Sequence, residues 1–414
     1  MSLLPSHDPA HGPGRPHGFV LAIVVAGVLT LVGAPGTAQA EVAVESVGVA
    51  HATGPAHRRP PAKGTVEERF VAGRPYTGTW ADPTVMRVGR HWVAAATTTG
   101  GLHLPVMTSS DLRTWRPRPP LPHHRRFTAR RQFNDGLPVK SRWSLTVRHR
   151  SRHTHRARPR MSQWAPSLAR AGHRYLAAYS AAVALKPTRR SCIGIATAAH
   201  PLGPYRDTRR RPLVCYRRSA RGVIDPEIFR DPATGRRYLL WKQEGIAGKQ
   251  RPMLMTRRLD VTGTRFKAGS RPVRLLALRH RWVRSHRNGA RYVRKHTWEG
   301  RVVENPSMVR FRGRLYLFYS GNAYATKRYA TGYAICRTPV GPCRRPVRRP
   351  VLTSRGRIAG PGGADAFVGR AGRLRLMYAS WDAGRVRRGN GTRRMHIATL
   401  RARRNGTLVL LRRR

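Results

Sequence analysis

Three acidic residues stand out in this sequence because each begins a similar stretch of chain. Asp82 lies in Ala-Asp-Pro, Asp225 in Ile-Asp-Pro and Glu304 in Glu-Asn-Pro, in a chain with only 18 Asp and Glu among 414 residues. One carboxylic acid that protonates a leaving oxygen and one carboxylate that activates water together can cleave a glycosidic bond. A third carboxyl group can raise the pKa of the acid by like-charge repulsion. The trio indicates acid–base hydrolysis if the fold brings the three side chains together.

Each acid also has a structural explanation. An Asp before Pro often initiates a turn through hydrogen bonds to its own backbone, and this explains Asp82 and Asp225 without any chemistry. Glu304, which stands before Asn-Pro, fits that explanation less well. Glu299, in Trp-Glu-Gly, is the alternative proton donor. We prefer Glu304 because it aligns with the other two acids at the start of a repeat.

An internal repeat would position these acids. Five segments open with a small turn element, run through a short apolar strand into a turn with Gly, and continue into a second strand rich in apolar and aromatic residues, which predicts a β-hairpin. The segments are ADPTVMRVGRHWVAAATT from Ala81, WAPSLARAGHRYLAAYS from Trp164, IDPEIFRDPATGRRYLLW from Ile224, ENPSMVRFRGRLYLFYSGN from Glu304 and GADAFVGRAGRLRLMYASWD from Gly363.

Further strand-like pieces lie between the hairpins, such as CIGIATAAHPLGPYRD and ATGYAICRTPVGPC, and would supply outer strands. Four strands in each of five units predict an all-β fold, a five-bladed β-propeller. A β-sandwich is the structural alternative, but it does not explain why the opening element returns five times. The innermost strand of each blade begins near the propeller axis, so the three acids are expected to converge there.

Two stretches break the repeat, from Arg116 to Arg160 and from about Lys267 to Lys295. Both are crowded with Arg, His and Pro and have little apolar periodicity. We expect them to be loops inserted on the propeller surface.

The N-terminus has the pattern of a secretory signal. Arg15 precedes an apolar run from Phe19 to Val32, and small residues lead to Ala38-Gln39-Ala40. A membrane anchor is the alternative, but the run is shorter than the roughly 20 residues of a spanning helix. We expect cleavage after Ala40, export and no membrane span in the mature chain. The predicted organisation is a signal peptide over 1–40, a flexible leader over 41–72 and a propeller over 73–414.

The charge is extremely positive. Lys and Arg total 81, and the formal net charge is +63. Such a chain attracts polyanions, including nucleic acid, acidic polysaccharide and anionic cell envelope. The charge is spread through every segment and no nucleic-acid-binding motif accompanies it, so a genome-wide bias toward Arg or non-specific polyanion adhesion explains it better than a dedicated nucleic-acid site, which we do not expect.

Four cysteines form two local pairs in the sequence. In an exported protein the simplest of the three possible pairings is Cys192 with Cys215 and Cys336 with Cys343. Neither pair has the spacing of a zinc site, so no metal is predicted there.

Taken together, these motifs resemble glycoside hydrolase family 43, the group of arabinanases, arabinofuranosidases and xylosidases. The resemblance runs from about Tyr76 to the C-terminus. Its carriers are ADP at 81–83, SSDLRTW at 109–115, WAP at 164–166, IDPEIF at 224–229 and VVENPSM at 302–308. The resemblance implies a polysaccharide or oligosaccharide substrate that contains pentose, of the arabinan, arabinoxylan or xylan type.

Position by position, the resemblance implies a role for each acid. Asp82 matches the general base, Glu304 the general acid, and Asp225 the residue that raises the pKa of the acid and orients it. The family inverts anomeric configuration, which implies roughly 6.5 to 9.5 Å between base and acid, with water between them. Trp164 is either a core residue or a platform on which a sugar ring stacks.

One departure from the family pattern concerns a metal. Many members have Gly-Pro-Gly-His where this chain reads Gly360-Pro361-Gly362-Gly363, and that His helps to hold a central calcium or water cluster. Its absence puts a structural calcium in question, although Asp365 offers a substitute ligand for a hard cation. No cofactor is expected to be required.

Three alternatives remain open from the sequence. The first is a secreted, non-catalytic propeller that binds carbohydrate or polyanions through its Arg-rich surface. The second is a related five-bladed hydrolase family, such as the fructan-active enzymes, with a nucleophilic aspartate and a retaining mechanism. The third is a nucleic-acid-binding protein, which has only the charge in its favour.

Overall fold

Five β-sheets arranged in a ring make up the fold of the computed structural model. The structure describes residues 78–99, 102–117, 135–144, 147–150, 157–160, 163–183, 190–216, 222–246, 250–285, 291–386 and 392–411. The predicted signal peptide and leader lie outside these residues. Within the described residues no helix is present, and so none that could cross a membrane.

The sheets, or blades, follow one another in chain order and run antiparallel from the inside outwards. Blade I contains β1 (Thr84–Val88), β2 (His91–Ala95), β3 (Val106–Ser109) and β4 (Arg116–Pro117). Blade II contains β7 (Gln163–Ala171), β8 (Arg174–Val183) and β9 (Arg190–Ala198). Blade III contains β10 (Val223–Arg230), β11 (Arg237–Gln243), β12 (Met253–Arg258) and β13 (Val273–Ala277).

The last two blades are built in the same way. Blade IV contains β16 (Val303–Phe311), β17 (Arg314–Gly321), β18 (Ala330–Cys336) and β19 (Cys343–Arg344). Blade V contains β20 (Ile358–Val368), β21 (Leu374–Asp382), β22 (Arg393–Ala402) and β23 (Leu408–Leu410). In blade II the place of the fourth strand is taken by single bridges, from Arg206 to Thr197 and from Val214 to Ile193.

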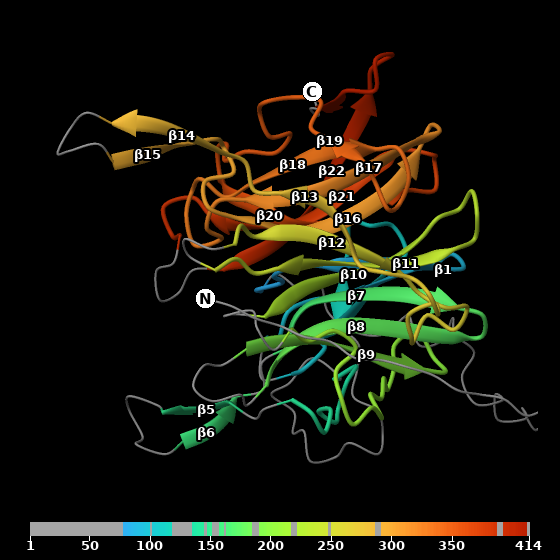
Figure 1. The fold of residues 1–414 in the computed structure, drawn as a ribbon. Helices are drawn as coiled ribbons and strands as arrows, with labels where there is room; N and C mark the ends of the chain where they lie inside the picture. Colours follow the sequence, from blue (N-terminus) through green and yellow to red (C-terminus); the bar gives the residue numbers. More distant parts are fainter. Residues whose placement is uncertain are drawn as a thin grey trace, which may run out of the picture. The chain divides into compact units, whose positions relative to one another are not determined.

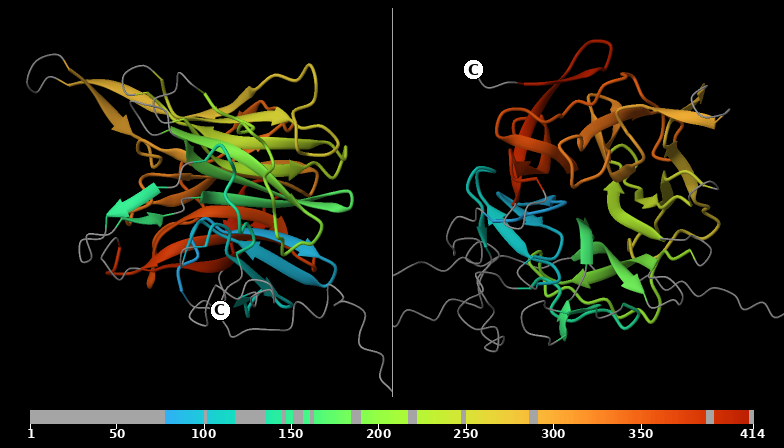
Figure 2. Two further views of the ribbon diagram at one scale, coloured as in Figure 1. Left: turned by 90° about the horizontal axis from the view of Figure 1, so that it is seen from below. Right: turned by 90° about the vertical axis from the view of Figure 1, so that its left-hand side faces the viewer.

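The ring closes through the innermost strands. β1 contacts β7, β7 contacts β10, β10 contacts β16, β16 contacts β20, and β20 returns to β1. Figure 2 shows this order as colours that pass around a centre from blue to red. The amide of Trp80 donates to the carbonyl of Arg393 (2.7 Å), which ties the start of blade I to blade V. The predicted five-bladed β-propeller is confirmed.

The core consists of five apolar clusters, one between each pair of neighbouring blades. Met86 of blade I packs with Tyr175 of blade II, for example, and Trp92 of blade I packs with Phe367 of blade V. Because each blade has neighbours on both faces, its central strands are buried on both sides. Burial on both faces explains the nearly continuous apolar runs of the hairpins, such as LYLFYSG in β17.

The two stretches predicted to be surface loops contain strands. The first includes β4 and the hairpin of β5 (Val147–Arg150) and β6 (Ala157–Arg160). The second includes β13 and the hairpin of β14 (His280–Ser285) and β15 (Arg291–His296). The prediction of plain loops was wrong because hairpins in these segments are rich in Arg and lack apolar periodicity. Both hairpins project from the same end of the propeller (Figure 1).

Both predicted disulfides are present. Cys192 in β9 pairs with Cys215, and Cys336 in β18 pairs with Cys343 in β19. Each bridge links a strand to the chain that follows it on the outer side of the same blade.

Candidate active site

The inner strands all begin with the same backbone distortion. The start of each inner strand contains a residue with a positive φ: Asp82 (47°), Ala165 (43°), Asp225 (57°), Asn305 (48°) and Gly363 (60°). Pro follows four of them, and in blades II to V the pairing with the next strand shifts register beside this residue. These bulges turn consecutive side chains of each strand start toward the axis.

The predicted equivalence of the three acids is wrong by one residue. Asp82 and Asp225 hold the positive-φ position, whereas Asn305 holds it in blade IV. Glu304 lies one residue earlier and corresponds to Ile224 and Trp164, which are the last paired residues before their bulges. Glu-Asn-Pro and Ile-Asp-Pro differ by this one-residue shift, so Glu304 enters the site from a different backbone position than the two aspartates.

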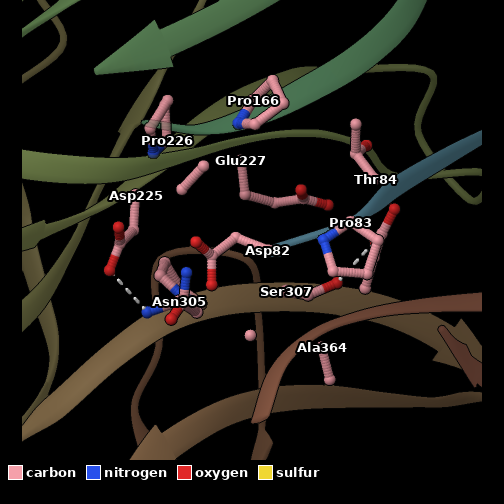
Figure 3. Close-up of a pocket in the computed structure, with 14 residues that line it drawn as sticks. Asp82, Pro83, Thr84, Pro166, Asp225, Pro226, Glu227, Asn305, Ser307 and Ala364 are labelled. Atoms are coloured by element: carbon pink, nitrogen blue, oxygen red, sulfur yellow. Dashed lines mark hydrogen bonds between the residues drawn. The ribbon is translucent and has the colours of Figure 1, made fainter. Parts of the chain in front are cut away.

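Asp82 and Asp225 line one axial pocket together with Asn305 (Figure 3). Asp82 accepts a hydrogen bond from the Thr97 hydroxyl (2.8 Å) and forms an ion pair with Arg393 (3.1 Å). Its side chain keeps 18% of its surface exposed. The carboxylate of Asp82 is thus held in place by two donors and still reaches solvent.

Asp225 is buried. Its Oδ2 accepts the backbone amide of Asn305 (2.9 Å), so the start of blade III is joined to the start of blade IV. Burial raises the pKa of Asp225 well above its usual value, and the negative charges of Glu304 and Asp82 raise it further, while Lys242 lowers it. The three predicted acids therefore interact electrostatically in one site.

Glu304 lies between a cation and a phenol. Its Oε2 is 2.9 Å from Nζ of Lys242, and its Oε1 is 2.8 Å from the hydroxyl of Tyr329. The same hydroxyl is 2.9 Å from Oδ1 of Asn305. Burial and the charge of Glu304 raise the pKa of Tyr329 well above its usual value, so this phenol stays a donor.

Lys242 is a buried cation with two carboxylate partners, Glu304 and Glu244 (3.0 Å). Those two charges and Asp225 raise its pKa in spite of its burial. Lys242 pairs with Ile224 across β10 and β11, beside the bulge that holds Asp225. It thus supplies positive charge to both Asp225 and Glu304.

Four residues that contact these acids, Thr97, Lys242, Tyr329 and Arg393, were not predicted from the sequence. Lys242 had a signal, since it is a charged residue of β11 directly after the apolar run Tyr-Leu-Leu-Trp. Arg393 had none in a chain with 81 Lys and Arg. The structure buries it to 5% exposure against Asp82 and places its guanidinium 5.8 Å from the ring centre of Tyr329.

Glu299, the alternative acid, has a structural role. Its side chain is 1% exposed and forms an ion pair with Arg345 (2.5 Å) and a hydrogen bond with the Tyr319 hydroxyl (2.7 Å). Trp164 is half-buried at the start of β7, at the position that Glu304 occupies in blade IV.

A second ring of polar residues lies two positions after the bulge residues. Its members are Thr84, Ser167, Glu227, Ser307 and Asp365. The hydroxyl of Ser167 donates to Glu227 (3.1 Å) and that of Ser307 to Asp365 (3.0 Å). Burial raises the pKa of Asp365 to about 6, and burial and the charge of Asp365 raise that of Glu227.

This ring does not fit a calcium centre. Calcium takes six to eight oxygen ligands, whereas this ring has two carboxyl groups and three hydroxyls, and the hydroxyls of Ser167 and Ser307 already donate to the carboxyl groups. Among the described residues no three His, Cys, Asp or Glu side chains form a metal-binding group. A side chain in place of Gly363 would put its Cβ 2.5 Å from Oδ1 of Asp82, so the family's histidine has no room here.

Comparisons with known proteins give the family of the chain. The family model for glycosyl hydrolases family 43 matches residues 74–408. The comparison with curated proteins found no match.

Solved structures share the fold. A thermostable family-43 glycoside hydrolase has a TM-score of 0.61 and 22% identity, over 82% of this chain and 95% of that one. An endo-1,4-beta-xylanase from Bacteroides thetaiotaomicron has a TM-score of 0.59 and 21% identity, over 82% and 97%.

An exo-1,5-alpha-L-arabinanase from a bovine ruminal metagenomic library is also similar. It has a TM-score of 0.53 and 17% identity, over 82% of this chain and 99% of that one. The family model covers most of the chain, and with it the strand starts that hold Asp82, Asp225 and Glu304. The chain belongs to glycosyl hydrolases family 43 and is a glycosidase.

Proposed function

We propose that the protein is a secreted enzyme that hydrolyses pentose-containing glycans of the arabinan, arabinoxylan or xylan type with inversion of configuration. The observation that carries the proposal is that Asp82 and Asp225 line one axial pocket and that Glu304 directly precedes Asn305 of the same pocket, each acid with different partners. The names of the similar structures, a xylanase and an arabinanase, support the substrate class.

In the proposed reaction Asp82 is the general base. Thr97 and Arg393 fix its carboxylate, and its partial exposure leaves an oxygen for a water molecule. The water loses its proton to Asp82 as it attacks the anomeric carbon, while Glu304 gives a proton to the leaving oxygen. Both groups then exchange protons with solvent, which restores the starting state.

Asp225 is the proposed modulator. Its raised pKa results from burial and from the neighbouring charges of Glu304 and Asp82, so protonation of one carboxyl group affects the others. It also fixes the backbone of Asn305, the residue after Glu304. Trp164, half-buried at the corresponding position of blade II, is the proposed platform for a sugar ring.

Export is proposed on the signal pattern of residues 1–40, and the two disulfides support an oxidising compartment. Residues 41–72 are proposed to be a leader before the catalytic propeller.

The test is sugar release from arabinan, arabinoxylan and xylan. We expect Glu304→Gln and Asp82→Asn each to lower kcat by about 10²- to 10⁴-fold, with Asp260→Asn, in the turn after β12, as the matched control. Nuclear magnetic resonance of the first product anomer measures the stereochemistry. Retained configuration, or full activity in Glu304→Gln, would overturn the proposal.

A further inference from the structure

A cleft of about 720 Å³ opens beside Glu304, and the proposed reaction does not use it. Its walls come from three connections at the end of the propeller where β16 begins: 297–302, 322–330 and 350–354. Tyr329 belongs to the cleft wall and its hydroxyl contacts Glu304. One side chain therefore separates the cleft from the proposed proton donor.

Trp298 gives the cleft an aromatic wall. Its indole stacks on Tyr319, with ring centres 5.5 Å apart and planes 30° apart. It also lies against two glycines, since a Cβ on Gly321 would come within 2.7 Å of the indole and one on Gly332 would overlap it. The side chain of Trp298 is half-buried. Its buried side packs against Tyr319 and the two glycines, and its remaining surface lines the cleft.

Asn322 connects two of the walls. Its Nδ2 donates to the carbonyl of Trp298 and to that of Arg328 (3.0 Å). The aromatic wall and the segment that carries Arg328 are therefore held at a fixed spacing, as a binding site requires.

The charge of the cleft is positive. Arg301, Lys327 and Arg328 line it and are exposed, and none of its described lining residues is Asp or Glu. The nearby Glu299 is buried in its ion pair with Arg345 and does not face these cations. A second cleft, beside His396, also contains arginines, but Asp111 lines it as well.

We propose that this cleft binds a uronic-acid residue of the glycan, through its carboxylate on the cationic side chains and its ring on Trp298. The proposal rests on the proposed function: the general acid protonates the leaving oxygen, so the sugars beyond the cleaved bond lie on the Glu304 side and extend into the cleft. Arginine binds carboxylates through paired hydrogen bonds, and an aromatic face packs against a sugar ring. The substrate class is thus an acidic pentose glycan.

The test compares each acidic glycan with its own neutral form. Glucuronoarabinoxylan and arabinan attached to galacturonan are assayed before and after chemical reduction of their carboxyl groups, which removes charge and keeps the ring. We expect kcat/KM to be about tenfold higher on the better acidic substrate than on its reduced form at low salt, and the ratio to fall as NaCl screens the charges.

The variant Arg301→Gln/Lys327→Gln/Arg328→Gln should remove this preference and leave the rate on the reduced glycan unchanged. The matched control is Arg210→Gln/Arg211→Gln/Arg236→Gln, which removes three exposed cations of blades II and III and should keep the preference. Equal rates on acidic and reduced glycans, or an equal loss of preference in the control, would overturn the inference while the hydrolase stands. Failure to cleave either form would instead refute the proposed function.

Discussion

Asp225 and Glu227 are two residues apart in one strand, yet they serve different rings around the axis. Asp225 interacts with Asp82 and Glu304 at the mouth, and Glu227 interacts with Asp365 farther along. Both carboxyl groups have raised pKa values because they are buried near like charges. Lys242 and Arg393 are ion-paired with acids of the first group, Glu304 and Asp82, and this is the group to which the proposed function assigns the chemistry.

Tyr329→Phe tests the positioning of the proton donor. The phenylalanine ring keeps the packing against Gly362 but removes the hydroxyl that contacts Glu304 and Asn305. We expect kcat to fall about tenfold with little change in KM, because one hydrogen bond to a charged group is lost. Tyr316→Phe, which removes a hydroxyl of blade IV that donates to the carbonyl of Gly406 in the β22–β23 turn of blade V, is the control and should keep its kcat. A normal kcat in Tyr329→Phe would refute the positioning role.

Glu227→Gln tests the second ring of polar residues through its effect on the stability of the fold. Burial raises the pKa of Asp365 from 3.8 to about 6, and that of Glu227 is raised as well. These two carboxyl groups therefore bind more protons in the folded state than in the unfolded chain above pH 4. Their contribution to the free energy of unfolding falls as pH rises through about 6. We expect Glu227→Gln to raise Tm at pH 8 by a few degrees and to flatten the dependence of Tm on pH.

Glu299→Gln is the control, because we expect it to change the free energy of unfolding in the opposite direction. Glu299 is ion-paired with Arg345 in the core, so Glu299→Gln should lower the free energy of unfolding by about 3 kcal/mol. A lower Tm for Glu227→Gln at pH 8 would contradict the prediction, because it would show that the charge of Glu227 stabilises the second ring.

At the scale of the element, the recurring feature is the bulged start of the inner strand. A positive φ costs a residue with a side chain about 1 to 2 kcal/mol, and the fold accepts this cost at Asp82, Ala165, Asp225 and Asn305. In blades I, III and IV the bulge residue contributes to the site or to its backbone contacts. Ala165 has no polar side chain, and only its backbone amide, which donates to the Thr97 hydroxyl (2.9 Å), takes part.

Ala165→Gly should therefore stabilise the protein by about 1 kcal/mol, because glycine adopts a positive φ without steric cost. Denaturant unfolding measures the change, and kcat should stay within twofold. Ala177→Gly, in the buried β8 strand, is the matched control and should destabilise the protein by about the same amount. Destabilisation by Ala165→Gly would show that the positive φ is not a source of strain.

At the scale of the whole molecule, the main feature is charge. The full chain, which forms this ring of five blades, has a formal net charge of +63. The charge is spread over all blades, so its average effect is self-repulsion and only its local arrangement, as in the cleft beside Trp298, is specific.

We expect Tm to rise as NaCl increases from 10 to about 200 mM, because salt screens this repulsion within the Debye length. Differential scanning calorimetry at pH 7 measures the shift, and KCl should give the same curve if screening and not sodium binding is the cause. A Tm that stays constant or falls with salt would contradict the expectation.

The amino-acid sequence determined the repeat, and with it the fold. Gly and Pro at fixed places and apolar runs between them are local signals, so the five hairpins, the blade count and the two short-range disulfides could be predicted. The hairpins β5–β6 and β14–β15 escaped prediction because arginine-rich strands carry no apolar period.

Tertiary structure alone decided the partners of the acids. Lys242, Tyr329 and Arg393 come from outside the five motifs' opening residues, and only the closure of the ring brings Arg393 to Asp82, 311 positions away in the chain. The offset of Glu304 by one residue from Asp82 and Asp225 can be seen in the sequence, because Pro follows Asn305 and not Glu304, but only the tertiary structure shows that Asn305 takes the backbone position of the two aspartates. The sequence by itself thus identified the three acids, and the fold determined which charges and donors surround each of them.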